Sequence, residues 1–555
     1  MGSKAGQGAM RNRFSSLSVA AVVVAALIAA PVLSVFSNVL AGDTGATWSH
    51  LADTVLGEFV FNTVVLCIGV GLGVSSIGVT SAWLTTMLDF PGRRFLEWAL
   101  VLPLAMPAYV MAYVYTDFLQ FVGPVQGWLR ETFEWRRGDY WFPDVRTVGG
   151  AVAMFMFVLY PYVYMIARTA FLERAGGMLE AGRTLGLGPW GSFFRVSLPL
   201  ARPAVVAGTA LALMETLADF GTVSYFGVQT FTTGIYRAWF SLGDRIAAAQ
   251  LSAALLAFVI LVLTLERMSR GRARFNNTSR QVAMPVRLRL PLPLGLLAAF
   301  ACFMPLLLGF LLPAGLLLRM AFLEGDAQFG ARFVELAHNS FVLAAITAVV
   351  AVLLAVLLAY AARLARSRLP QALNRIVGLG YAVPGSVIAV GVLIPLTRLD
   401  RWLAEGWEAM WGFNPGLLLT GGIAALVYAY LARFLAVALQ TVESSLGKIT
   451  PNMDDASRSL GFGKWATLRR VHMPMLRGSL LTAGLLVFVD VMKELPATLV
   501  IRPFNFDTLA TQAHTLAADE RLAEASTAAL IIVAVGLLPM FWISRQILRV
   551  RRREG

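Results

Sequence analysis

The stretch EAGRTLGLGPWGSFFRVSLP at residues 180–199 recurs 275 residues later as DASRSLGFGKWATLRRVHMP at residues 455–474. Both copies place two glycines and a tryptophan at equivalent positions, and both end in an apolar residue followed by proline. Each copy is too polar to cross a membrane, yet each lies between long apolar runs. A segment repeated in this setting predicts that the chain is a duplication of one set of membrane helices.

The composition predicts a membrane protein. The 555-residue chain is 58% hydrophobic and 14% charged, whereas a soluble domain carries about 25% charged residues. Its net charge of +14 is spread over short connections between apolar runs, where lipid head groups and membrane topology account for it. We therefore expect an all-α polytopic membrane protein, and we do not expect nucleic acid as a partner.

Apolar runs long enough to cross a hydrocarbon layer of about 30 Å recur along the whole chain. We expect twelve membrane helices, near residues 18–40, 59–88, 95–123, 148–172, 203–222, 246–268, 290–320, 338–363, 376–397, 416–440, 476–492 and 526–548. The first run resembles a signal peptide because Arg11 and Arg13 precede it. Its length of about 22 residues favours a retained helix instead.

The arginines predict the orientation of these helices. They cluster at both ends of the chain and in every second loop, whereas the other loops are mixed or acidic, as at Asp43, Asp53 and Glu58. The positive-inside rule then places both termini in the cytoplasm. This alternation requires an even number of helices, which supports twelve.

The duplication extends beyond the repeated segment. ETLADFGT at 215–222 aligns with DVMKELPA at 490–497, and Asn62 and Pro107 align with Asn339 and Pro384. We therefore predict two parallel six-helix repeats, a first half at 1–265 and a second half at 291–555, joined by a basic cytoplasmic linker at 266–290. Parallel repeats of this kind frame a pathway at their interface.

The first copy of the segment reads as two short helices on the cytoplasmic side. EAGRTL forms the first helix, and Gly186 and Gly188 form a turn in which a positive φ costs nothing. WGSFFRV forms the second helix, and Pro199 marks the return to the membrane. An ordinary interfacial amphipathic helix is the alternative, but its repetition at matching places in both halves argues against it.

Two pairs of acids follow the repeated segments. Glu215 and Asp219 are four residues apart and so share a helix face, as do Asp490 and Glu494 in the second half. Carboxylates suit a hard cation, so these four acids could form an acidic gate or a transient site for a cationic or metal substrate. The alternative is that they cap helix ends or pair with basic side chains, for which the candidates are Lys493, Arg237 and Arg245.

The chain shows no catalytic motif. None of its lysines lies in a phosphate-binding G-x-x-x-x-G-K-[ST] loop, and no H-E-x-x-H or G-x-S-x-G sequence is present. Its two cysteines, Cys67 and Cys302, lie in apolar runs and suggest neither a disulfide framework nor a zinc site. We expect no catalytic residue and no cofactor in this chain.

The repeated segment resembles the EAA loop of ABC importer permeases. Its first copy fills that pattern with Glu180, Ala181, Gly182, Gly186, Val196, Leu198 and Pro199, and its second with Asp455, Ala456, Ser457, Gly461, Val471, Met473 and Pro474. The resemblance implies a coupling helix that docks into a groove of an ATPase subunit. The sequence departs from the usual pattern at Gly182, Asp455 and Ser457.

Most of the chain beyond the first helix resembles the fused, two-half permeases of bacterial ferric-iron ABC importers. The segments that carry this resemblance are 215–239, 338–344, 382–393 and 493–514. The resemblance implies a type I-like permease of the plasma (inner) membrane, with an extracytoplasmic binding protein outside and an ATPase dimer, which binds ATP and Mg, inside. Thiamine, polyamine or phosphonate is the alternative cargo, and a secondary transporter with 6+6 repeats is the alternative class.

Overall fold

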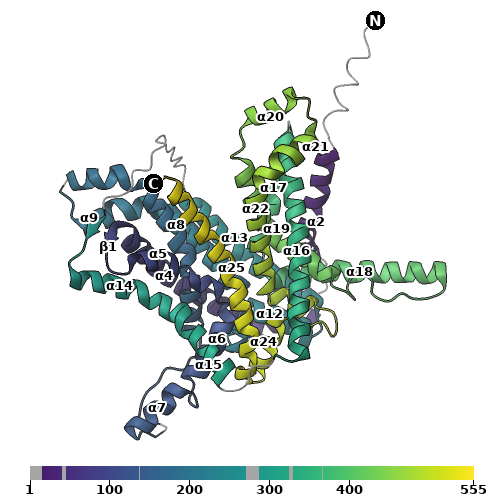
Figure 1. Ribbon diagram of the computed structural model, residues 1–555. Helices are drawn as coiled ribbons and strands as arrows, with labels where there is room; N and C mark the ends of the chain where they lie inside the picture. Colours follow the sequence, from purple (N-terminus) through teal and green to yellow (C-terminus); the bar gives the residue numbers. More distant parts are fainter. Residues whose placement is uncertain are drawn as a thin grey trace. The chain divides into compact units, whose positions relative to one another are not determined.

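The computed structural model describes residues 16–39, 45–136, 138–184, 186–270, 287–323, 329–365 and 367–554, most of which are helical (Figure 1). The chain divides into two compact units. The first unit holds Met1–Thr44, Ala238–Ala253 and Ala331–Thr511, and the second holds Gly45–Arg237, Ala254–Gly330 and Gln512–Gly555. Each unit therefore takes segments from both sequence halves, so the predicted halves at 1–265 and 291–555 do not coincide with the compact units.

The elements of the first unit are α2 (Ser16–Val39), α16 (Ala331–Leu364), α17 (Leu369–Gly378), η5 (Gly380–Ala382), α18 (Gly385–Trp411), α19 (Ala424–Leu446), α20 (Pro451–Ser459), α21 (Lys464–Thr467), η6 (Leu468–His472), α22 (Met473–Met492) and α23 (Pro496–Ile501). Three further elements contain residues of both units: η3 (Arg237–Ser241), α13 (Arg245–Arg270) and α24 (Leu509–Ala518).

The elements of the second unit are α3 (Gly45–Thr54), α4 (Leu56–Met87), β1 (Leu88–Asp89), α5 (Arg93–Ala99), η1 (Leu102–Ala105), α6 (Ala108–Leu119), α7 (Pro124–Phe133), α8 (Val148–Thr184), α9 (Pro189–Ser192), η2 (Phe193–Ser197), α10 (Leu198–Ala218), α11 (Gly221–Tyr225), α12 (Phe231–Tyr236), β2 (Leu288–Arg289), α14 (Leu292–Leu306), η4 (Leu307–Leu311), α15 (Leu312–Leu323) and α25 (Leu522–Glu554).

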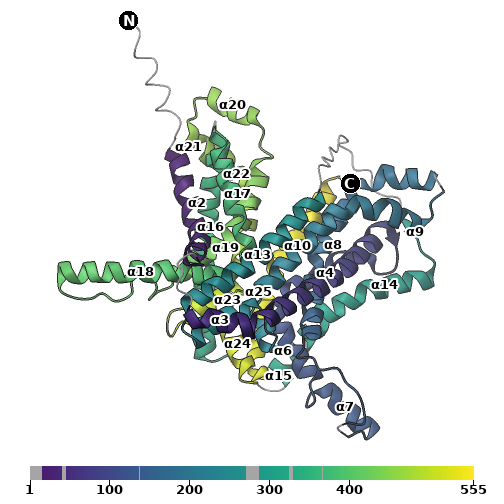
Figure 2. The ribbon, with the colours of Figure 1, turned by 180° about the vertical axis from the view of Figure 1, so that it is seen from behind.

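The core of the first unit is a bundle of α16, α19 and α22, which lie side by side in both views (Figures 1 and 2). Helix α2, from the start of the chain, packs against α16 of this bundle and against α17 and α18 beside it. Its backbone comes so close to α18 that a Cβ on Gly391 would lie 2.2 Å from the carbonyl oxygen of Pro31. Only glycine permits this approach, because any side chain would collide with a backbone atom.

The core of the second unit is the matching bundle of α4, α8 and α10, and α25, from the end of the chain, packs against α15. The preceding helix, α24, contributes His514, whose Nδ1 lies 2.8 Å from the Tyr113 hydroxyl and whose ring lies beside Phe220. Burial lowers the pKa of His514 to about 4, so the imidazole is neutral at physiological pH. A residue near the end of the sequence is thus tied to the α6 helix of the first half.

The structure has ten helices that are long and apolar enough to span a membrane, and up to twelve if each of two bent pairs is one span, counted over the described residues. The two spans expected near 95–123 and 376–397 are not continuous helices, because each is a bent pair. Arg93–Ala105 and Ala108–Phe133 meet at 93°, and Leu369–Ala382 and Gly385–Trp411 meet at 112°. Both bends lie at the aligned prolines, Pro107 and Pro384, because proline lacks an amide hydrogen and cannot continue the helix before it.

Two short strands pair the end of α4, in the first half, with the end of the predicted linker. Leu88 and Asp89 pair in parallel with Leu288 and Arg289, and both strands belong to the second unit. Of the predicted linker at 266–290, the first residues extend α13 and residues 271–286 lie outside the described ones. The last residues of the predicted linker therefore pair with the residues that follow α4.

The contact between α2 and α18 predicts a destabilising variant. Gly391→Ala should force α2 away from α18 and lower the unfolding free energy by about 1–3 kcal/mol, as overpacking does. The measurement is the thermal midpoint of the purified chain in detergent. Gly406→Ala, in the same helix but with open space around its Cα, is the matched control and should be neutral or slightly stabilising. Equal midpoints for both variants would contradict this packing of the first helix.

Candidate functional site

The first copy of the repeated segment forms the end of one long helix and the start of another. The sequence predicted a separate short helix for EAGRTL. This prediction is wrong, because α8 runs without a break from Val148 to Thr184. Glu180, Ala181 and Gly182 lie in this helix, and their side chains are outside the described set. Gly186 follows with a φ of 77° and turns the chain toward α9. This is the positive φ that the sequence predicted.

The second copy has the same order of elements but begins with its own short helix. Pro451 starts α20 at a position where the first half has Gly176, and proline fits the first turn of a helix. Gly461 has a φ of 80°. Gly188 does not have the positive φ that the sequence predicted for it, so that part of the prediction is wrong. Its equivalent, Gly463, has an extended backbone with a φ of −71°.

Both copies enter their next membrane helix through a five-residue π-helical turn. The turn spans Phe193–Ser197 in the first half and Leu468–His472 in the second, and α10 and α22 start directly after it. Pro199 and Pro474 lie in the first turns of these helices, as the sequence predicted. The two copies are therefore alike in backbone structure as well as in sequence.

Asp454 anchors the second copy to the membrane bundle. Its carboxylate accepts a hydrogen bond of 3.0 Å from Arg363 Nε, and its other oxygen lies 2.7 Å from the buried His472. Arg363 also donates to the carbonyls of Leu446 and Ile449, where α19 ends. These contacts join α16, α19, α20 and η6, so the segment is held rigidly to α16.

The sequence pattern selected the neighbouring acid, Asp455, and missed Asp454. The structure places Asp455 on the surface, where it pairs only locally with Arg458. The motif could not reveal Asp454, because its main partner, Arg363, lies 91 residues away in the sequence. Ser457, a departure from the family pattern, is buried and hydrogen-bonded to Thr467 at 2.8 Å.

Aligned residues of α4 and α16 hold the two copies by different contacts. Tyr360 of α16 donates a 2.6 Å hydrogen bond to the carbonyl of Lys464 in the second copy. Its equivalent in α4, Trp83, packs its ring against Phe193 of the first copy at a centroid distance of 4.9 Å. The aligned residues Trp83 and Tyr360 thus each connect one copy of the repeated segment to the helix bundle of its own unit.

The predicted acidic pairs are divided by the ends of their helices. Helix α10 contains Glu215 and ends at Ala218, and α22 contains Asp490 and ends at Met492. Asp219 and Glu494 therefore do not continue the helix face of the first acid, as the sequence predicted. Each turns instead toward the short helix that follows.

Asp219 and Glu494 accept hydrogen bonds from the first-turn amides of those short helices. Asp219 accepts from the amide of Thr222 at 2.8 Å and from its hydroxyl at 3.1 Å. Glu494 accepts from the amide of Ala497 at 2.9 Å and from the amide and hydroxyl of Thr498 at 3.1 and 2.7 Å. This geometry is the capping arrangement that the sequence left open as the alternative.

Two of the acids also have basic neighbours. Lys493 Nζ lies 2.9 Å from the Asp490 carboxylate, which is one of the pairings that the sequence suggested. Arg433 of α19 lies 3.5 Å from Glu494, and both side chains are buried. Arg433 has no basic equivalent in the first half, where Val158 holds its place, so the sequence repeat gave no sign of it.

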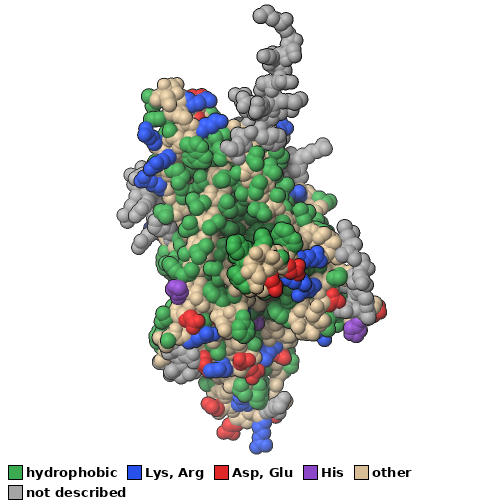
Figure 3. Space-filling model, turned by 90° about the vertical axis from the view of Figure 1, so that its right-hand side faces the viewer, with side chains coloured by type: hydrophobic (Ala, Val, Ile, Leu, Met, Phe, Trp, Pro, Cys, Tyr) green, Lys and Arg blue, Asp and Glu red, His purple; other side chains and the backbone are tan. Residues whose placement is uncertain are grey.

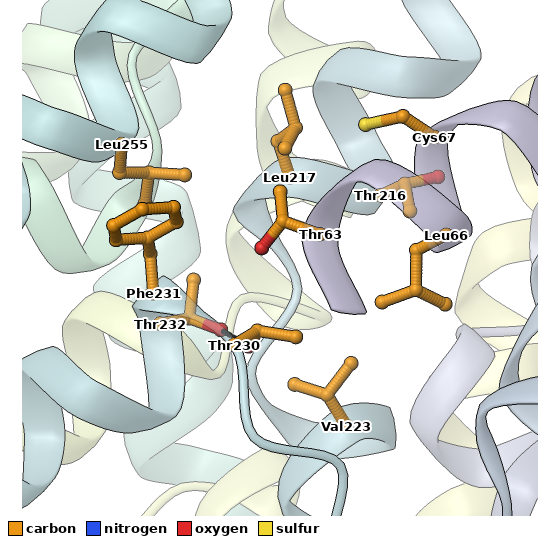
Figure 4. Close-up of a pocket in the computed structure, with 10 residues that line it drawn as sticks. All are labelled: Thr63, Leu66, Cys67, Thr216, Leu217, Val223, Thr230, Phe231, Thr232 and Leu255. Carbon is orange, nitrogen blue, oxygen red and sulfur yellow. Dashed lines mark hydrogen bonds between the residues drawn. The ribbon is translucent and has the colours of Figure 1, made fainter. Parts of the chain in front are cut away.

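A cavity in the second unit lies beside the Asp219 cap (Figure 4). Threonines of α4, α10 and α12, and Thr230 directly before α12, line it together with apolar side chains. Thr232 donates to the carbonyl of Asp219 at 2.8 Å and lies 2.9 Å from the Thr230 hydroxyl. The Thr63 hydroxyl is buried and has no hydrogen-bond partner among the described residues.

The second half fills the corresponding place differently. Ser340, the equivalent of Thr63, accepts a hydrogen bond of 2.8 Å from the amide of Leu509. Thr508 and Thr511 form the same capping contact at 2.8 Å that Thr230 and Thr233 form in the first half. These two regions, before and within α12 and α24, thus share a backbone capping contact and differ in their other side chain contacts.

The described residues contain no group of three or more His, Cys, Asp or Glu side chains that could hold a metal ion. The four predicted acids are divided between the two units, with Glu215 and Asp219 in one and Asp490 and Glu494 in the other. Their role in a pathway for a metal substrate remains a prediction.

The comparisons with known proteins agree with the repeat. The family model described as "Binding-protein-dependent transport system inner membrane component" matches residues 74–274 and again 351–553. The chain is 27% identical over 500 residues to the Fe(3+)-transport system permease protein FbpB 2 of Haemophilus influenzae, which covers 88% of this chain and 90% of the relative.

Two further relatives differ in how much of the chain they cover. The putative ferric transport system permease protein FbpB 1 of Haemophilus influenzae is 23% identical over 501 residues, 85% of this chain and 75% of the relative. The molybdenum transport system permease protein ModB of Escherichia coli is 32% identical over 213 residues, 35% of this chain and 87% of the relative. The two ferric relatives align with most of both halves, whereas ModB has the length of one half.

The anchor of the second copy predicts unequal effects for two neighbouring acids. Asp454→Asn should lower the unfolding free energy by about 1–3 kcal/mol, because Arg363 and His472 lose their shared carboxylate. Asp455→Asn, the matched control, should cost about 0–1 kcal/mol, because it removes only an exposed pair. Thermal midpoints and limited proteolysis near residue 460 measure both effects. A larger loss for Asp455→Asn would refute the anchoring role.

Proposed function

Because the chain belongs to the family of binding-protein-dependent transport system inner membrane components, we propose that it is the transmembrane permease subunit of an ATP-driven ABC importer. One observation carries this proposal: the repeated segment takes the same helix, turn and π-turn order in both halves, and the family model covers both. A secondary transporter would have no ATPase to dock, so it gives no reason for two matched cytoplasmic segments.

We propose ferric iron as the cargo. The two relatives that align with most of the chain are named as a Fe(3+) and a putative ferric transport permease. The molybdenum relative spans only about a third of this chain. Iron is favoured over thiamine, polyamine or phosphonate for this reason.

In the proposed mechanism, an ATPase dimer docks on the two coupling segments, which are residues 180–199 and 455–474. Each segment is joined to a long membrane helix, the first through Trp83 of α4 and the second through Tyr360 and Arg363 of α16. Movement of the ATPases would therefore shift α4 and α16 as rigid rods, since a continuous helix transmits displacement along its axis. ATP and Mg are bound by the partner, and this chain supplies no catalytic group.

At the other end of the same bundles, the capped breaks at Asp219 and Glu494 act as hinges. The carboxylates satisfy amides that a broken helix would leave without partners in the bilayer. Their hydrogen bonds make Asp219 and Glu494 poor ligands for a passing cation. Glu215 and Asp490, which stay within their membrane helices, are the better candidates for the cargo pathway.

The remaining parts of the proposal follow from the family and the distribution of arginine. An extracytoplasmic binding protein delivers the iron, and alternating access carries it inward. The chain lies in a bacterial plasma (inner) membrane with both termini in the cytoplasm.

The coupling role predicts the effect of one glycine. Gly461→Val should reduce transport-stimulated ATP hydrolysis by about tenfold, because a β-branched residue at a φ of 80° is strained and would unfold the turn. The assay uses proteoliposomes that hold the chain with its partner ATPase. Gly463→Ala, at a φ of −71° with open space around it, is the control and should retain activity. Normal stimulation in Gly461→Val would count against coupling through this turn.

The cargo pathway predicts a second effect. Glu215→Gln combined with Asp490→Asn should reduce uptake of radioactive iron by about tenfold, since each half then lacks a fully charged oxygen that could bind a hard cation. The complex should still assemble, which co-purification of the ATPase checks. Glu131→Gln, an exposed acid of α7, is the control. Unchanged uptake would rule out the acidic pathway, and transport of thiamine in place of iron would overturn the choice of cargo.

A further inference from the structure

The first unit carries an arm that leaves its helix bundle sideways. Helix α18 starts inside the unit, where residues 385–394 are buried, and its second half projects from the bundle of α16, α19 and α22 in both views (Figures 1 and 2). We call residues 398–420, which are the end of α18 and the turn that follows, the lateral arm. Its helix makes an angle of 112° with α17 before it.

The helix of the lateral arm has one apolar and one charged face. At 100° per residue, one half of the helix surface carries its large apolar side chains and the other half its exposed charges, whereas the buried Asp400 lies on the apolar half. The apolar half holds Trp402, Leu403, Trp407, Met410 and Trp411, and the charged half holds Arg398, Arg401, Glu405 and Glu408. Trp402, Met410 and Trp411 are 68%, 74% and 67% exposed, so the apolar face lacks a cover within the described chain.

Asp400 fixes the turn of the lateral arm against this helix. It is fully buried and accepts hydrogen bonds from the amides of Leu418, Leu419 and Thr420 at 3.0, 2.8 and 2.7 Å. The Thr420 hydroxyl donates a further bond of 2.6 Å. The turn therefore extends the apolar face with exposed Phe413, Leu417 and Leu418, and this face is a built feature of the fold.

The position of the lateral arm along the bundle is given by α19. This helix begins at Ala424, just after the arm, and ends at Leu446, whose carbonyl accepts a hydrogen bond from Arg363 in the anchor of the second coupling segment. Twenty-three helical residues span about 33 Å. The arm thus lies about one hydrocarbon thickness, roughly 30 Å, from the coupling segment.

We propose that the lateral arm lies in the lipid head-group layer on the side of the membrane opposite the coupling segments, with its apolar face toward the acyl chains. A crosswise amphipathic helix at this depth matches the geometry of interfacial helices. Three tryptophans within ten residues match the aromatic belt at membrane surfaces. The arm carries two arginines against three acids, Asp400, Glu405 and Glu408, so it has no excess of positive charge to attract lipid head groups, and its apolar face holds it there.

The surroundings of the arm agree with this assignment. Figure 3, which looks onto the free end of the arm, shows hydrophobic side chains over the middle of this face and a small charged group at the arm itself. The arm continues directly from the buried segment after Pro384. Lipid contact would therefore hold the bent α17–α18 span at a fixed depth.

A fluorescence experiment tests the lipid contact. Cys67→Ser and Cys302→Ala remove the native thiols, and single cysteines at Met410→Cys and Trp411→Cys carry an environment-sensitive dye. Glu405→Cys and Glu408→Cys, on the opposite face, are the matched controls. In phosphatidylcholine liposomes, lipids spin-labelled near the head group should quench the dye at 410 and 411 roughly twofold or more above the controls. Equal quenching at all four positions would overturn the proposal.

A second measurement does not depend on the cysteine variants. Brominated lipids quench tryptophans near the head groups, so Trp402→Leu/Trp407→Leu/Trp411→Leu should remove part of the quenching seen in the native chain.

Adding the extracytoplasmic binding protein to the labelled cysteine variants distinguishes lipid contact from protein contact. Protection of positions 410 and 411 that appears only after this protein is added would show that the arm contacts protein and not lipid, and would overturn the proposal.

Discussion

A break in a membrane helix exposes amide groups that no water can satisfy, and this structure depends on how those groups are satisfied. Helix α10 ends before Asp219 and α22 before Glu494, and each carboxylate binds the amides of the short helix that follows. The breaks at Pro107 and Pro384 use residues that have no amide hydrogen to lose. The same capped and proline-marked breaks occur at equivalent positions in both halves, so they are regular features of this fold.

The two halves share this backbone design but not their charges. Arg433 joins Glu494 in the first unit, where the equivalent place in the second unit holds Val158. Glu97 pairs with Arg168 in one half, and in the other the aligned Asn374 hydrogen-bonds to Glu443 at 2.6 Å. The backbone constraint is common to both halves because both are helices in lipid, whereas each local charge needs only one partner and can vary independently.

The sequence predicted much of the membrane architecture. Apolar length alone indicated the spans, because about 20 residues are needed to cross the bilayer. The repeat located the two matched segments between membrane helices and predicted the positive φ of Gly186. It could not reveal Asp454, since the partners of that carboxylate come from α16 and η6. It also treated Glu215 and Asp219 as one helix face, because a spacing of four residues does not show where a helix ends.

From the sequence alone it followed that this chain is a duplicated, helical membrane protein with two matched segments, at 180–199 and 455–474. Those properties follow from local patterns, namely hydropathy, spacing and repetition. Which helix packs on which became clear from the three-dimensional structure, in which α2 belongs to the first unit and α25 to the second. Apolar helices are alike in hydropathy, so their partners are chosen by shape, as where Pro31 fits against Gly391. That choice gives each compact unit segments from both halves.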